Sequence, residues 1–182
     1  MLNKKVLTEE FIISDQIPSI LKIDTDLLLQ NALVNFHNKK RVNDDPFYYD
    51  YHYTKLDDNK NVTWVQDYIR DHYRAEHHKT PILTKSDALI QAEGDIIGNH
   101  HHIDDWDYKG SPDISALYCL EAREKPSNIM FEYECGRDRK RRWRMPMKTG
   151  QVVIFSSSLL HSLTRNENKD PIVNLSFQFQ LL

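Results

Sequence analysis

The chain has 182 residues, of which 40 % are hydrophobic and 28 % charged, a balance typical of a globular protein with one sizeable core. Its formal net charge of −3 and its pI near 6.3 argue against a general nucleic-acid binder, which normally carries a basic excess. No apolar run reaches the roughly 18 residues of a transmembrane helix and the N-terminus lacks a signal-peptide core, so we expect no membrane association. With only two cysteines, a disulfide framework is disfavoured and a cytoplasmic location is expected.

The first 80 residues have the pattern of a strand and two helices. We expect a strand over residues 4–13, helices over 24–38 and 62–76, and a loop over 42–61. Apolar positions recur at helical spacing in both helices, and Asp24 or Thr25 is the expected N-cap of the first. Thr63 is the expected cap of the second helix, and Pro81 marks its end.

After Pro81 the sequence consists of short apolar runs separated by turn residues. We expect strands over 87–103 (interrupted at Gly94 and Gly98), 114–120, 128–134, 141–147, 151–155, 159–164 and 171–181. Two helices followed by many short strands predict helices that pack against an antiparallel barrel or sandwich. We therefore expect one domain over 1–182, in which 1–80 supports a β core formed by 81–182.

Histidine is the residue type that points to chemistry. Three histidines are consecutive at positions 100–102, and Asp104 follows two residues after His102. Because side chains alternate along a strand, His102 and Asp104 would point to the same side and could bind one ion. His161 lies in the later expected strand LLHSLT. Two imidazoles and one carboxylate form the facial triad of non-haem iron(II) sites, so these three residues are the predicted metal ligands and catalytic centre.

Residues 87–182 resemble the 2-oxoglutarate/iron(II)-dependent oxygenases, in particular the prolyl-hydroxylase-like group. The family's strand, glycine and HxD motif match AEGDIIGNHHHID, and its next strands match SALYCL and SNIMFEY. Its glycine turn, apolar strand and distal histidine match KTGQVVIFSSSLLHSL, and its last strand matches VNLSFQFQL. The resemblance implies a mainly β, jelly-roll or cupin-like double-stranded β-helix with N-terminal supporting helices. It also implies that Fe(II), 2-oxoglutarate and O₂ are used to hydroxylate a peptide side chain, an amino acid or a small metabolite.

The resemblance also assigns cosubstrate contacts, with one departure. The family places an Arg or Lys about ten residues after the distal histidine, where it pairs with the far carboxylate of 2-oxoglutarate, and Ile172 stands there in this chain. Arg165 is the nearest substitute. Tyr118 and Asn174 match positions that supply uncharged hydrogen bonds to the cosubstrate. Two other basic residues on the expected β core could replace the missing cation: Arg123 and Arg144.

Two alternatives remain open. His100 lies two residues before His102, so His100, His102 and His161 could form a three-histidine site, like that of cupin-type dioxygenases that do not use 2-oxoglutarate. If His102 and Asp104 bind the metal instead, we expect His100 to contact a ligand residue or the substrate. The second alternative is a non-catalytic jelly-roll module that binds a metal.

Overall fold

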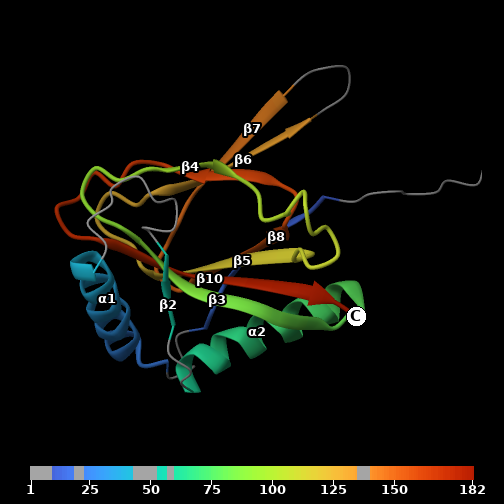
Figure 1. Ribbon diagram of the computed structural model, residues 1–182, viewed down its shortest axis with the longest axis horizontal. Helices are drawn as coiled ribbons and strands as arrows, with labels where there is room; N and C mark the ends of the chain where they lie inside the picture. The colour runs from blue at the N-terminus through green and yellow to red at the C-terminus, as the bar shows by residue number, and fades with distance from the viewer. Residues whose placement is uncertain (1–9, 19–22, 43–52, 57–59, 135–139) are drawn as a thin grey trace, which may run out of the picture.

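The computed structural model describes residues 10–18, 23–42, 53–56, 60–134 and 140–182. These residues form two helices and ten strands (Figure 1). In chain order they are β1 (Ile12–Gln16), α1 (Thr25–Val42), β2 (Tyr53–Lys55), α2 (Lys60–His77), β3 (Pro81–Gln91), β4 (Ile97–His100), β5 (Ile114–Glu121), β6 (Asn128–Glu134), β7 (Lys140–Pro146), β8 (Gln151–Ser156), β9 (Leu160–Leu163) and β10 (Ile172–Leu181).

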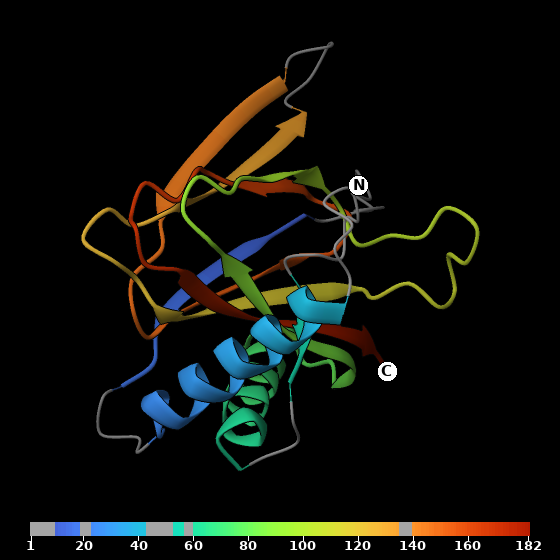
Figure 2. The same cartoon turned by 60° about the vertical axis from the view of Figure 1, so that its left-hand side comes forward.

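The strands form two antiparallel sheets that face each other. The larger sheet has the order β1-β8-β5-β10-β3-β2 and the smaller has the order β4-β9-β6-β7. Both helices cover the outer face of the larger sheet, opposite to the smaller sheet (Figures 1 and 2). From β3 onward the chain passes back and forth between the two sheets, apart from the β6–β7 hairpin within the smaller sheet. This is a double-stranded β-helix with supporting helices, and the expected fold class is confirmed.

The larger sheet is buried on both faces, which creates two apolar cores. Between the sheets lies an inner core: Leu89, Ile97, Leu117, Cys119, Ile129, Phe131, Met147, Val153, Phe155, Leu159 and Leu163. Between the larger sheet and the helices lies an outer core that includes Leu28, Val65 and Ile69 from the helices and Tyr118 and Leu175 from the sheet. Odd-numbered residues of β5 near Cys119 therefore face the inner core, and even-numbered residues face the helices.

Both helices form where the sequence predicts them, although both are longer than expected. The Asp24 carboxylate accepts a hydrogen bond from the Leu27 N–H (3.0 Å), which caps α1. In α2, Val62, Val65 and Ile69 recur at helical spacing and are buried. However, α2 begins at Lys60, so Thr63 lies inside the helix and the expectation that it caps the helix is wrong.

The strand bounds differ from expectation in three places. The first strand is found at Ile12–Gln16 rather than over 4–13, of which residues 1–9 lie outside the described part of the chain. Pro81 does not follow the helix directly but begins β3, and Gly94 (φ 84°) forms a turn that separates β3 from β4. The short strand β2 lies in the expected loop. Within the described residues, neither helix combines the length and apolar character needed to cross a bilayer.

Candidate metal centre

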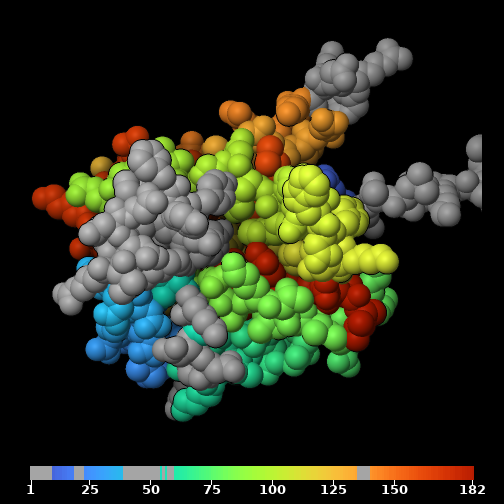
Figure 3. Space-filling model, viewed as in Figure 1, coloured from blue at the N-terminus to red at the C-terminus, as the bar shows by residue number. Residues whose placement is uncertain are grey.

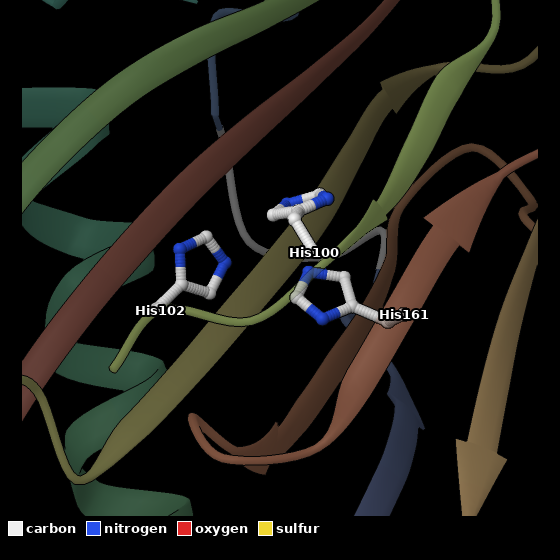
Figure 4. Close-up of side chains that lie close together, drawn as sticks. All are labelled: His100, His102 and His161. Carbon is white, nitrogen blue, oxygen red and sulfur yellow. The ribbon is translucent and has the colours of Figure 1, made fainter. Parts of the chain in front are cut away.

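The pairing of β4 with β9 places His100 directly opposite His161. His102 lies two residues beyond the end of β4, where its N–H donates a hydrogen bond to the Ser157 carbonyl (2.9 Å). This bond attaches the segment after β4 to the end of β8. The three imidazoles consequently gather between the two sheets (Figure 4).

The three rings are close enough to share one ion. Their centroids are separated by 4.2 Å (His100–His161), 5.0 Å (His102–His161) and 5.1 Å (His100–His102). One ring nitrogen from each residue lies within 4.8 Å of the other two. The group of potential metal donors found among the described residues consists of these three imidazoles and contains no carboxylate.

In each of the three rings, Nδ1 already has a polar contact. Nδ1 of His100 lies 2.8 Å from the Gly98 carbonyl, and Nδ1 of His161 lies 2.9 Å from the Leu159 carbonyl. A carbonyl can only accept, so both rings carry their proton on Nδ1 and present an unprotonated Nε2. Nδ1 of His102 lies 2.8 Å from the side-chain amide of Gln178. This is the arrangement that fixes the orientation of histidine ligands in metal sites.

Burial keeps the three imidazoles neutral. Desolvation is the main cause that lowers the pKa of His102 from 6.5 to about 3, and the neighbouring His100 lowers it further. Desolvation also lowers the pKa of His161 well below its ordinary value, and it lowers the pKa of His100. Neutral imidazole is the form that binds a metal, so no proton has to leave these rings at neutral pH.

Aromatic side chains from both sheets pack beside His161, on one side of the histidine group. Phe155 of β8 packs edge-to-face on His161, with ring centroids 4.6 Å apart. Phe131 of β6 lies beside His161 (6.2 Å) and stacks on Trp143 of β7 (6.0 Å), whose side chain is 40 % exposed at the sheet edge. The registers His100↔His161, His161↔Phe131 and Phe131↔Trp143 thus form one row of rings across the smaller sheet, from the metal centre to solvent.

The structure brings His102 and His161 together but leaves Asp104 outside the histidine group. Asp104 is exposed, and its carboxylate accepts a hydrogen bond from the Trp106 N–H (2.9 Å). Its own N–H donates to the Ser111 hydroxyl (2.7 Å). These bonds belong to the turn between β4 and β5, which stands over the C-terminal end of β10 (Figure 3). The geometry therefore favours the three-histidine alternative over the set with Asp104.

The three expected cosubstrate residues are not gathered at one place. Tyr118 belongs to the outer core and faces the helices, and burial raises its pKa. Arg165 is exposed in the segment between β9 and β10. Asn174 of β10 is fully buried, and neither atom of its amide has a hydrogen-bond partner among the described residues. Because Asn174 shares a face of β10 with Gln178, its side chain points between the sheets. Of these three residues, Asn174 is the one whose buried amide needs a hydrogen-bond partner, such as a ligand or water.

In the described part of the chain, no basic side chain occupies the position where the family places an Arg or Lys and this chain has Ile172. Ile172 is 1 % exposed on β10. Arg123 pairs with the carboxylate of Glu121 (2.7 Å) and donates to the Pro171 carbonyl (3.2 Å). Arg144 is exposed on β7, the edge strand of the smaller sheet.

Gln178 contacts His102 through its side-chain amide and was not predicted from the sequence. Its position four residues after Asn174 on the last strand was the available signal, because every second residue of a strand lies on the same face. The donor set as a whole fits a first-row divalent metal such as iron(II), since neutral imidazoles held through their other nitrogen are ligands that these metals accept.

No protein-family model matches the sequence, and no curated protein matches it either. The fold is similar to solved structures. A non-haem α-ketoglutarate-dependent carbocyclase, SnoK from nogalamycin biosynthesis, aligns with a TM-score of 0.61 at 10 % identity over 94 % of this chain and 79 % of its own. AviO1 from Streptomyces viridochromogenes Tue57 aligns with a TM-score of 0.62 at 10 % identity over 94 % and 90 %. A Pseudomonas putida prolyl-4-hydroxylase aligns with a TM-score of 0.53 at 13 % identity over 93 % and 84 %. The chain therefore has the fold of the 2-oxoglutarate/iron(II) oxygenases.

Proposed function

We propose that this protein is a mononuclear non-haem iron(II) oxygenase whose metal is held by His100, His102 and His161. The observation that carries the proposal is the convergence of three imidazoles within 4.8 Å of one another, between the two sheets of an oxygenase fold. Bound iron(II) would supply the redox chemistry that activates O₂. Three protein ligands leave about three coordination positions for O₂ and an organic ligand.

The residues of this chain would prepare the site for that chemistry. The Nδ1 contacts of His100 and His161 fix both rings before the metal arrives. Phe131 and Phe155, both fully buried, keep bulk water away from one side of the centre. A prearranged site shielded from water on that side would favour reaction with a bound substrate over reaction with solvent.

2-Oxoglutarate is the proposed cosubstrate. Three neutral imidazoles leave the charge of a divalent metal uncompensated, which favours a chelating anion such as an α-keto acid. Oxidative decarboxylation of 2-oxoglutarate to succinate and CO₂ supplies two of the four electrons that reduce O₂. Hydroxylation of a peptide side chain, an amino acid or a small metabolite supplies the other two. The unpartnered Asn174 amide is the proposed uncharged contact for the cosubstrate.

A second form of the function omits 2-oxoglutarate, so that the organic substrate supplies all four electrons. Two observations favour it. Ile172 is buried where the related enzymes place a cation, and Arg165 is exposed rather than directed between the sheets. The ligand set of three histidines is also the one expected for cupin-type dioxygenases.

Anaerobic titration of the iron(II)-loaded protein with 2-oxoglutarate tests the proposal. The expected result is a weak visible charge-transfer band that saturates and is absent when succinate replaces 2-oxoglutarate. Iron binding without a band, together with O₂ consumption that depends on another substrate, would favour the second form. Iron binding with neither response would leave a metal-binding module and contradict the assignment as an oxygenase.

A further inference from the structure

The contact at Nδ1 of His102 differs in kind from the Nδ1 contacts of His100 and His161. His100 and His161 face backbone carbonyls, which accept hydrogen bonds and cannot donate them. Gln178 faces Nδ1 of His102 with an amide, which carries both a donor and an acceptor. The tautomer of His102 therefore depends on which end of this amide points to the ring.

The two orientations of the amide have opposite consequences for a metal. If the amide nitrogen donates to Nδ1, the proton of the neutral ring resides on Nε2, and that nitrogen cannot bind an ion. If the amide oxygen accepts from Nδ1–H, Nε2 is unprotonated, as in His100 and His161. In the structure the nitrogen Nε2 of Gln178 lies 2.8 Å from Nδ1 of His102, and a half-turn of the amide places the oxygen there instead.

The surroundings allow this half-turn. Among the described residues, the contact with His102 is the hydrogen bond found for the Gln178 amide. No second bond from the described part of the chain holds the amide in one orientation, and the residue is half-buried. The neighbouring Gln180 differs, because its amide nitrogen is committed to the Lys109 carbonyl (3.0 Å).

We propose that Gln178 is a positioning residue that couples the tautomer of His102 to the occupancy of the metal centre. When a divalent metal binds to Nε2 of His102, the Gln178 amide turns so that its oxygen accepts the proton on Nδ1. Without the metal, both orientations are accessible. In one of them Nε2 of His102 carries the proton and cannot bind a metal as the third ligand. This inference rests on the proposed three-histidine centre and adds a residue that controls it from β10.

Replacing Gln178 by methionine and by glutamate separates this role from simple packing. Gln178→Met keeps the length of the side chain but removes the acceptor, so Co(II), used as a stable probe for iron(II), should bind about 10–100-fold more weakly. Gln178→Glu offers only acceptors to Nδ1–H, so Co(II) should bind at least as tightly as to the wild-type protein. Gln180→Met is the matched control, because it removes a glutamine that anchors the same turn without touching a histidine.

The tautomer itself gives a second measurement that does not depend on metal binding. In the metal-free protein, long-range ¹H–¹⁵N NMR spectra should show His102 protonated on Nδ1 in Gln178→Glu and a mixture of tautomers in the wild type. Unchanged spectra in Gln178→Glu, or equal Co(II) affinities for the Met and Glu variants, would overturn the inference. Failure of the wild-type protein to bind Co(II) would instead contradict the proposed function, while the NMR result would still show whether Gln178 sets the tautomer of His102.

Discussion

The buried imidazole of His102 predicts that acid destabilises the metal-free protein. Its pKa falls from 6.5 in the unfolded chain to about 3 in the folded protein, chiefly through desolvation. Below pH 6.5 the unfolded state therefore binds a proton that the folded state rejects until about pH 3. The stability that depends on a neutral His102 is present above pH 6.5 and is lost progressively as the pH falls from 6.5 toward 3.

The size of the effect follows from the pKa difference. Each unit of separation corresponds to about 1.4 kcal/mol, so lowering the pH from 7.5 to 5.0 should cost about 2 kcal/mol through His102 alone. The other two histidines of the site change stability in the same direction, because burial lowers both of their pKa values.

Urea denaturation in the presence of a chelator at pH 7.5 and 5.0 measures this loss. His102→Gln removes the titrating group, so its free energy of unfolding should fall by about 2 kcal/mol less than that of the wild type over this range. His101→Gln, which replaces the exposed neighbour, is the control and should retain the pH dependence of the wild type. Equal losses for the wild type and His102→Gln would refute the reasoning.

Three further predictions concern the core, a helix end and the cosubstrate. Phe131→Ala should lower the free energy of unfolding by about 3–5 kcal/mol in urea denaturation, because this fully buried ring packs on Phe155 and Trp143; a loss below 1 kcal/mol would contradict the packing. Asp24→Ala should cost about 1 kcal/mol in the same assay, because it removes the cap that accepts the Leu27 N–H, whereas Asp24→Asn should preserve most of the stability. Arg165→Ala should change the affinity for 2-oxoglutarate by less than about twofold in the anaerobic titration, because Arg165 is exposed; a tenfold loss would show that it reaches the cosubstrate.

The strands of the fold were predictable where apolar side chains run between clear turns. The bounds of β6 and β8 and the helix α1 lie within a few residues of expectation, because alternation, helical spacing and the glycine turn at Gly150 are local properties of the sequence. The first half of β3 was missed, because half of its residues are polar and most of them are at least partly exposed. Pairing with β10 makes it a strand, and sequence periodicity does not report such a distant partner.

The proposed ligand set was harder to predict for a different physical reason. The expectation that His102 and Asp104 share a face assumed an extended strand through both residues, but β4 ends at His100. Beyond that point the rule of alternation no longer holds. The turn after β4 directs Asp104 to Trp106 and Ser111, and the bond to Ser157 directs His102 back toward His161.

The face of Tyr118 could not be read from the sequence either. Every residue of β5 from Ile114 to Leu120 is buried, because the larger sheet has an apolar core on each side. A strand covered on both faces carries no alternation of polar and apolar residues. The direction of Tyr118 toward the helices is therefore a property of the packing and not of the local pattern.

The most direct test of the three-histidine centre is the Co(II) affinity of His100→Ala compared with that of Asp104→Ala, measured by the visible spectrum of the bound ion. We predict that His100→Ala weakens binding by more than about 100-fold, the upper end of the loss when a residue that merely orients a ligand is removed. Asp104→Ala should stay within about twofold of the wild type, because its carboxylate is exposed and bound to the Trp106 N–H. The reverse result, with collapse of binding in Asp104→Ala and survival in His100→Ala, would contradict the account and restore the set of two histidines and one carboxylate.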